Sequence, residues 1–309
     1  METLSKTLGD SGINTSEINS FTVIIPTYNR GEIALNTVKE LEKQSYPSFQ
    51  VIVVDQSQEA VPDLVNYEGQ HFNYTYHHIN KPGLPNARNV GIELTTTEFA
   101  IFLDDDCIPE VALIKEFNLA FQGHESTLAL VGGRVIEKGS NIFHERASLT
   151  GGYVTRYGKT LKNFDTDASG ECEWAAGGNF SVRVSVFKEV GGFDHNFIGT
   201  AVMEDSDFGY AVGRKGYKIR YTPGPVMEHL RIPTGGLRQA DPAAGMLYRA
   251  HNSVYFFRKY QLKRYLPVVT AYLYAVAAKD WLTGKHGIAA FYYCSVGLIR
   301  GFRTELRVV

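Results

Sequence analysis

Residues 99–106 read Phe-Ala-Ile-Phe-Leu-Asp-Asp-Asp, an apolar run that ends in three adjacent carboxylates. Five successive apolar residues are typical of a short strand that is buried on both faces of a sheet. The carboxylates of Asp104, Asp105 and Asp106 repel one another, and a bound divalent cation would relieve that repulsion. Oxygen ligands suit Mn²⁺ or Mg²⁺. A solvated turn is the alternative, but the strand directly before the carboxylates disfavours it.

Strands and helices alternate on both sides of this run. Since alternation of this kind is typical of a mainly parallel sheet flanked by helices, we predict an α/β fold. Ligands of such sheets bind beyond the carboxyl ends of the strands, so Pro26-Thr-Tyr-Asn29, Asp55 and the Asp triplet should converge there. We expect strands over 21–25, 50–54, 72–78 and 99–103, and helices over 30–44, 84–94 and 111–121.

The second half of the chain has a different pattern. The alternation weakens after residue 131, and residues 139–170 are rich in loop-forming types. A helix over 183–190, a helix over 204–215 and a strand over 217–221 follow, and the pattern from about residue 245 is helical, basic and aromatic. We therefore predict a disordered tail (1–20), a catalytic domain (21–244, with a nucleotide-binding half 21–136 and an acceptor-side half 137–244) and a helical C-terminal region (245–309).

Composition and charge argue against several classes of partner and of site. The formal net charge is -2 over 309 residues, so no global field favours nucleic acid as a partner. Cys107, Cys172 and Cys294 are too scattered for a thiolate metal cluster or a disulfide framework. The first twenty residues contain no apolar core of a secretory signal, so we expect a cytoplasmic protein, in reach of the inner face of the cell membrane.

Other charged residues are candidates for binding or catalysis. Glu204 and Asp205 belong to a second acidic cluster, although acidic residues are also common at the start of a helix. His229 follows a Pro-Gly-Pro turn and gains interest only beside a metal site. Arg88 lies near a predicted helix start, where phosphate binds well. Residues 231–238, which end at Arg238, could form either a mobile flap over a diphosphate or an ordinary surface loop.

Seven motifs follow one another along the chain: Val-Ile-Ile-Pro-Thr-Tyr-Asn (23–29), Val-Val-Asp (53–55), Gly83 with Ala-Arg-Asn-Val-Gly (87–91), Phe-Leu-Asp-Asp-Asp (102–106), Gly-Gly-Asn (177–179), Gly-Gly-Phe-Asp (191–194) and Glu-Asp (204–205). Taken together in this order, they resemble glycosyltransferase family 2. The resemblance covers roughly residues 21–236 and implies a GT-A (Rossmann-like) fold, a nucleotide-sugar donor, a divalent cation and transfer with inversion. UDP is the commonest nucleotide of the family's donors, with dTDP and GDP as alternatives.

The resemblance also implies residue roles. Asp205 matches the catalytic base, with Glu204 as its nearest rival, and Asp106 with His229 would hold the metal. The other residues would contact the nucleotide-sugar: Pro26, Thr27 and Tyr28 beside the base, Asp55 hydrogen-bonded to it, Arg88 and Arg238 on the nucleotide, Asp104 or Asp105 near the ribose, and Gly178 and Asn179 under the sugar. The family often continues Asp55 with a second carboxylate, but here Gln56 follows.

The acceptor is left open by the sequence, as either a glycan or a lipid-linked sugar. Arg258, Lys259, Lys263 and Arg264 precede an apolar, aromatic run, which suits either a peripheral contact with an anionic membrane or helices that pack on the protein or form a homodimer. A sugar-1-phosphate nucleotidyltransferase is a competing interpretation, but it should carry a glycine-rich basic loop after the first strand. A non-catalytic carbohydrate- or membrane-binding module would not need both acidic clusters.

Overall fold

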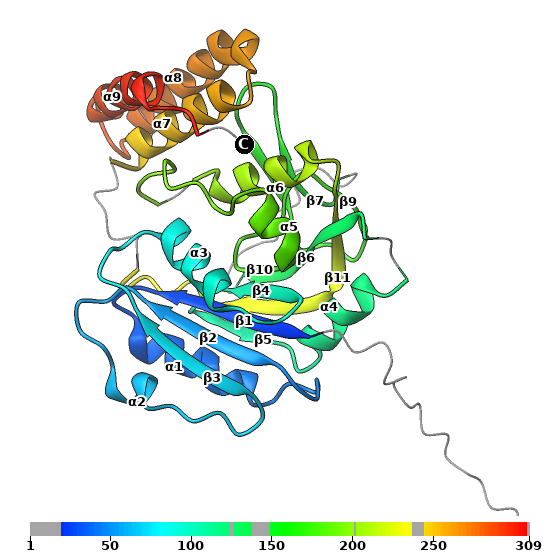
Figure 1. The fold of residues 1–309 in the computed structure, drawn as a ribbon. Coiled ribbons are helices and arrows are strands. Elements are labelled where there is room, and N and C mark those ends of the chain that lie inside the picture. The colour runs from blue at the N-terminus through cyan, green and yellow to red at the C-terminus, as the bar shows by residue number, and fades with distance from the viewer. Residues whose placement is uncertain (1–19, 124–125, 138–148, 201, 237–243, 308–309) are drawn as a thin grey trace, which may run out of the picture.

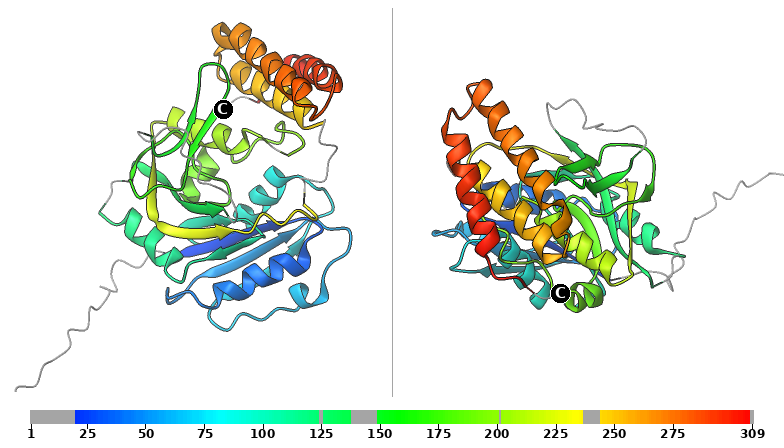
Figure 2. Two further views of the ribbon diagram at one scale, coloured as in Figure 1. Left: turned by 180° about the vertical axis from the view of Figure 1, so that it is seen from behind. Right: turned by 90° about the horizontal axis from the view of Figure 1, so that it is seen from above.

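The computed structural model describes residues 20–123, 126–137, 149–200, 202–236 and 244–307 (Figure 1). The predicted tail, apart from its last residue, lies outside the described residues, and so does Arg238. The chain forms an α/β fold in which helices cover both faces of a nine-stranded sheet, and three further helices lie at one end (Figure 2). The predicted fold class is confirmed.

The first half of the chain builds the parallel part of the sheet. Strand β1 pairs in parallel with β2 and β4, and β2 pairs in parallel with β3. The residues of β1 and β4 are buried throughout, because helices pack on both faces of these central strands. All of these elements begin and end within three residues of their predicted bounds: β1 (Phe21–Thr27), α1 (Gly31–Leu41), β2 (Gln50–Asp55), β3 (Asn73–His78), α3 (Leu84–Leu94), β4 (Phe99–Leu103) and α4 (Leu113–Phe121).

The second half adds strands that the sequence did not predict. Strand β10 lies antiparallel between β4 and β6, and β11 pairs with β6 in parallel and with β5 antiparallel. β11 was expected to end at residue 221 but continues to His229, with a register shift between Tyr221 and Val226 that accommodates the Pro-Gly-Pro turn. Helices α5 (Val184–Glu189) and α6 (Glu204–Arg214) agree with the predicted helices to within one residue, and β11 spans Lys218–His229. The elements that the sequence did not predict are β6 (Leu128–Glu137), β7 (Gly151–Val154), β8 (Thr160–Asn163), β9 (Gly170–Glu171) and β10 (Asn179–Arg183) in this half, and α2 (Pro62–Val65) and β5 (Cys107–Pro109) in the first half.

Two apolar cores lie on opposite faces of the sheet. Helices α1 and α4 pack on one face, where Val38 and Phe117 are fully buried. Helices α5 and α6 pack on the other, around a cluster of aromatic rings that includes Phe102 and Phe193. Because both faces are covered, the polar residues at the strand ends are held by a rigid support.

The C-terminal helices share a third core with the second half of the sheet domain. Helices α7 (Ala244–Lys259), α8 (Leu266–Leu282) and α9 (Ala289–Arg303) pack together, and α7 also packs on Phe197 and Met203. The predicted helical region is therefore confirmed. None of the helices in the described ranges has the length and apolar content needed to cross a bilayer.

Two of the basic residues expected at a lipid surface are instead internal. The Lys259 ammonium lies 2.8 Å from a carboxylate oxygen of Asp194 and 2.8 Å from one of Asp207, and its side chain is almost wholly buried. Arg258 donates to the carbonyls of Gly301 and Thr304. Of the two alternatives that the sequence left open, packing on the protein is the one observed for Arg258 and Lys259, because both charges hold α7 to its neighbours. Removing one partner of a buried ion pair, such as that of Lys259 with Asp194, typically lowers the free energy of unfolding by about 3–5 kcal/mol.

Candidate active site

A cavity of about 420 Å³ opens beyond the carboxyl ends of β1 and β4. The first half of the chain contributes Pro26, Thr27 and Tyr28 from the end of β1 and the whole Asp triplet after β4. The second half contributes Gly178, Asp205 and His229, so segments far apart in sequence line one space. The predicted convergence of the strand ends is therefore observed for β1 and β4.

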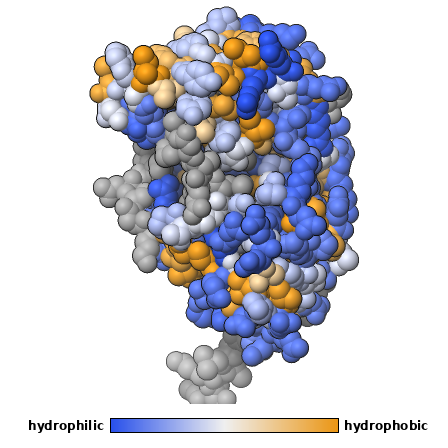
Figure 3. All heavy atoms as spheres, turned by 90° about the vertical axis from the view of Figure 1, so that its left-hand side faces the viewer, coloured by the Kyte–Doolittle hydropathy of each residue, from blue (hydrophilic) through white to orange (hydrophobic). Residues whose placement is uncertain are grey.

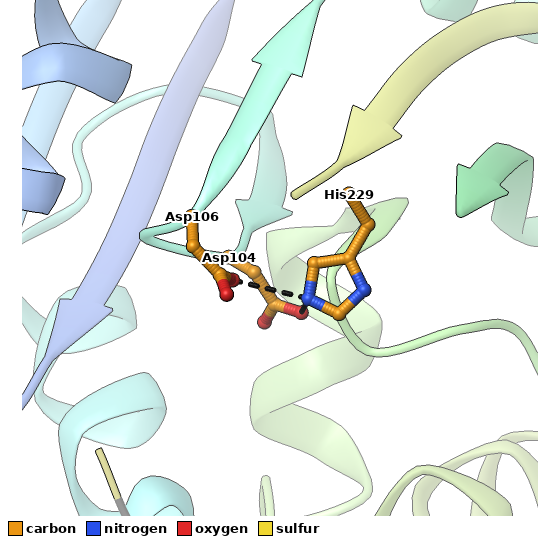
Figure 4. A group of neighbouring side chains, drawn as sticks. All are labelled: Asp104, Asp106 and His229. Atoms are coloured by element: carbon orange, nitrogen blue, oxygen red, sulfur yellow. Dashed lines mark hydrogen bonds and ion pairs between the residues drawn. The ribbon is translucent and has the colours of Figure 1, made fainter. Parts of the chain in front are cut away.

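Three side chains on one wall of the cavity could hold a metal ion. Asp104 and Asp106 follow β4, His229 ends β11, and one ligand atom from each lies within 4.8 Å of the others (Figure 4). The His229 Nε2 atom is 3.0 Å from Asp106 Oδ1 and 3.9 Å from Asp104 Oδ2. β11 must run on past its Pro-Gly-Pro turn to bring the imidazole here.

The donor set fits a divalent cation with mixed oxygen and nitrogen ligands. Mn²⁺ accepts both carboxylate and imidazole ligands, whereas Mg²⁺ prefers oxygen alone. Burial by itself would raise the pKa of Asp106, but the hydrogen bond with His229 and the Arg30 charge together lower it. The carboxylate is therefore ionised and ready to bind a cation.

Asp105 has a structural environment that differs from that of its neighbours. Its carboxylate accepts from the Thr27 hydroxyl at 2.8 Å and from the Arg30 guanidinium at 3.2 Å. Burial raises the pKa of Asp105 to about 6. Since the Asp105 side chain is 9% exposed and that of Asp104 is 30% exposed, Asp104 is better placed to meet a ribose.

Arg30 is a site residue that sequence reasoning missed. Its guanidinium lies 3.3 Å from Asp106 and donates to the backbone carbonyls of Ile232 and Thr234. The Ile232 N–H donates in turn to Asp106 at 3.0 Å. The described part of the predicted flap, up to residue 236, is therefore tied to the Asp triplet. On the sequence alone Arg30 reads as the polar start of a helix, and no motif singles it out.

The second acidic cluster is held by Arg88, which also lies 4.0 Å from Asp104, and its Asp205 lines the same cavity. The Arg88 guanidinium donates to Glu204 at 3.0 Å, to Asp205 at 2.9 Å and to the Gly177 carbonyl at 2.9 Å. Arg88 is itself only 2% exposed, so its expected contact with a nucleotide stays a prediction, and its observed partners are these groups.

Asp205 and Glu204 differ sharply in access to the cavity. The Asp205 side chain is 31% exposed and lines the cavity, and its second oxygen accepts from the Gly177 N–H. The Glu204 side chain is 2% exposed. Burial raises the pKa of Glu204 to about 8, against the opposing effect of Arg88. Because a general base must reach the substrate, this geometry favours Asp205.

Two further residues expected at the nucleotide-sugar are buried and bonded to protein groups, so their contacts with the donor stay predictions. Asp55 is fully buried and accepts from Ser57 and Tyr76, while the adjacent Gln56 lines the cavity in its place. Asn179 is also buried, and its amide donates to backbone carbonyls of β6 and β11. Both side chains point into the protein, which a motif alone does not reveal.

Gly178 is required for the close approach of β10 to Asp104. A methyl group at Gly178 would overlap the Asp104 carboxylate. We expect Gly178→Ala to displace this candidate ligand and to weaken Mn²⁺ binding by about 10-fold or more, as measured by calorimetric titration.

Gly213→Ala is the matched control, because nothing lies within 4 Å of that position and Gly213 is inside α6. It should leave Mn²⁺ affinity unchanged and stabilise the helix by about 0.5–1 kcal/mol. Unaltered Mn²⁺ affinity in a folded Gly178→Ala protein would show that Asp104 is not a ligand.

Comparison with known proteins supports one family. The model of the family described as "Glycosyl transferase family 2" matches residues 22–191, more than half of the chain. The probable glycosyltransferase YdaM of Bacillus subtilis is 25% identical over 227 residues, which cover 69% of this chain and 51% of that protein. Chondroitin synthase of Escherichia coli is 25% identical over 303 residues, 86% of this chain and 44% of that protein. The chain thus spans about half the length of these relatives.

Solved structures share the fold. GalNAc-T7, crystallised with UDP, GalNAc and Mn²⁺, is 15% identical with a TM-score of 0.58, covering 82% of this chain and 54% of that one. The mannosyltransferase PcManGT from Pyrobaculum calidifontis, in complex with GDP-Man and Mn²⁺, is 18% identical with a TM-score of 0.54, covering 91% and 85%. S. aureus TarS 1-349, in complex with UDP-GlcNAc, is 17% identical with a TM-score of 0.56, covering 77% and 66%. At these identities the likeness shows the fold alone.

Proposed function

Since the chain belongs to glycosyl transferase family 2, we propose that it transfers a sugar, with inversion and with the help of Mn²⁺ or Mg²⁺, from a nucleotide-sugar to an acceptor hydroxyl. The observation that carries this proposal is that one cavity is lined both by the candidate metal ligands Asp104, Asp106 and His229 and by the accessible carboxylate of Asp205. The three candidate metal ligands suit a diphosphate with its cation, and Asp205 suits the role of proton acceptor.

The donor would lie across the ends of β1 and β4. Pro26, Thr27 and Tyr28 would flank the base, with Gln56 beside them, and Asp104 would face the ribose. A UDP-sugar is the first candidate, because two of the solved relatives named above bind UDP or UDP-GlcNAc. GDP is the alternative, because PcManGT binds GDP-Man.

Asp106 and His229, with Asp104, would hold the cation. A cation bound there acts as a Lewis acid and offsets the negative charge that develops on the diphosphate leaving group. The chain itself orients this site, since Arg30 and the Ile232 N–H fix the Asp106 carboxylate. We also propose that the donor carries a hexose, because the solved relatives named above bind UDP-GlcNAc and GDP-Man.

Asp205 would accept the proton of the acceptor hydroxyl. A carboxylate oxygen has two lone pairs, so each oxygen of Asp205 can accept a hydrogen bond from the acceptor in addition to its bond from Arg88 or Gly177. Attack by that hydroxyl on the face of the sugar opposite the diphosphate would invert the anomeric centre. Residues 21–244 would form the catalytic domain, and its second half would meet a glycan or lipid-linked acceptor.

A panel of nucleotide-sugars tests this function. The full chain is incubated with UDP-, dTDP- and GDP-sugars, with and without Mn²⁺, and release of nucleoside diphosphate is measured. We expect release from one donor class, and loss of that release in EDTA. Pyrophosphate formation from a nucleoside triphosphate and a sugar-1-phosphate would point instead to a nucleotidyltransferase. If neither reaction occurs with any donor, a non-catalytic binding module becomes the better interpretation.

A further inference from the structure

Large apolar side chains are unusually exposed on the last two helices. Most of the exposed large apolar residues of the described chain lie between residues 268 and 302, although this segment is a small part of it. Leu282 and Ile288, which flank the turn between α8 and α9, are 77% and 78% exposed. The set comprises Val268, Tyr274, Trp281, Leu282, Ile288, Tyr292, Ile299 and Phe302, and we call it the α8–α9 face.

Helix α8 is apolar on all sides but is only partly covered. Of its seventeen residues only Lys279 and Asp280 carry charge, and only Val269, Leu273 and Ala277 are buried. A helix that is apolar all round is normally enclosed by protein or lipid. The uncovered side of α8 therefore lacks the environment that its composition suits.

The exposed sides of α8 and α9 form one continuous face. The Tyr274 hydroxyl is hydrogen-bonded to Ser295 at 2.9 Å, and the Trp281 ring contacts the Phe291 ring edge-on. Ile288, which directly precedes α9, and Tyr292 and Ile299 on that helix are exposed and recur at helical spacing. Figure 3 shows hydrophobic side chains among hydrophilic ones over these helices, at the top of the molecule.

The charge around this face is positive. Residues 244–309 carry ten Lys and Arg against two acidic residues, a net charge of +8, whereas the whole chain has a net charge of -2. The rest of the chain is therefore at -10. In the described segment 262–307 the exposed charged residues are Lys263, Arg264, Lys279, Lys285, Arg300, Arg303 and Glu305.

We propose that the α8–α9 face docks on an anionic lipid bilayer, in the plane of the interface. Apolar and aromatic side chains would enter the headgroup region while the surrounding Lys and Arg meet lipid phosphates. Trp281 and Tyr292 suit this depth, because amphipathic rings concentrate at membrane interfaces. The charge argues against a symmetric contact with a second copy, since an isologous interface would bring two positive faces together.

Docking would also place the cavity close to the membrane. α7 lies beneath α8 and α9 and shares a core with Met203, which lines the cavity. The part of the cavity that the second half of the chain lines, where an acceptor is proposed to bind, is therefore the part joined to the lipid-facing helices. A lipid-linked acceptor could reach it without leaving the bilayer surface.

Vesicle flotation with the full-length chain tests the proposal. Vesicles of phosphatidylcholine mixed with phosphatidylglycerol should carry the protein to the top of a gradient, and high salt or phosphatidylcholine alone should reduce the floating fraction. The double change Leu282→Ser and Ile288→Ser should weaken vesicle binding by about 10-fold or more, because it removes the most exposed apolar surface.

The matched control is Val111→Ser with Leu119→Ser. These residues are 50% and 47% exposed on the sheet domain, far in sequence from the C-terminal helices, and their double variant should float like the wild type. Thermal unfolding checks that both variants fold, and light scattering reports their mass. Wild-type protein that stays at the bottom with anionic vesicles overturns the proposal. So does a dimer that Leu282→Ser with Ile288→Ser converts to a monomer, which would identify a second copy as the occupant.

Discussion

Asp106→Ala is expected to abolish transfer, with a fall in turnover of about 10³-fold or more, while the protein remains folded. The Asp106 carboxylate is central to the candidate metal site, because it contacts His229, Arg30 and the Ile232 N–H at once. Lewis-acid stabilisation of a leaving group is worth several kcal/mol, and each 1.36 kcal/mol corresponds to about tenfold in rate.

Metal binding provides a readout that does not depend on turnover. Calorimetric titration should detect Mn²⁺ binding to the wild type and to Asp63→Ala, an exposed aspartate on α2, but not to Asp106→Ala. Asp106→Asn serves as a second variant, because the amide oxygen can still accept from Ile232 and so preserves the loop. Full activity of either Asp106 variant, or of the wild type in EDTA, would contradict a metal-dependent reaction.

The sequence predicted the parallel part of the sheet well, because there each element carries its own signal. β1 and β4 are continuous apolar runs, and α3 begins directly after a glycine and includes a proline in its first turn. β10 and β6 do not carry a clear local signal of this kind. β10 is a five-residue strand whose place between β4 and β6 depends on pairing with residues distant in the chain. Local pattern cannot show pairing of this kind.

The site residues show what a motif can and cannot predict. Five of the seven family motifs contribute residues that line the cavity, whereas motifs 53–55 and 191–194 contribute none, and a motif does not give the direction of a side chain. Asp55 and Glu204 both lie in matching motifs, yet both are buried and bound to protein groups. Arg30 and Lys259 carry no motif, and their importance comes from partners more than 50 residues away. Only the folded chain brings such partners together.

The Asp205→Asn protein is expected to bind the nucleotide-sugar nearly as well as the wild type and to turn over about 10²–10⁴-fold more slowly, the usual effect of a positioned base. The amide has nearly the size of the carboxylate and can still accept from Arg88, but it cannot take a proton from the acceptor. Donor affinity, measured by calorimetry with Mn²⁺, and turnover, measured as transfer, should therefore separate.

Glu204→Gln is the matched comparison, because Glu204 is the neighbouring carboxylate on the same guanidinium but does not line the cavity. Its amide oxygen can keep the hydrogen bond from Arg88, so we expect a smaller loss of turnover, caused only by a less firmly held Arg88. If Asp205→Asn transfers like the wild type and Glu204→Gln is inactive, the two roles are exchanged. If both variants transfer normally, the acidic cluster serves only to begin α6, where its charges favour the positive end of the helix dipole, and the proton must leave through another group.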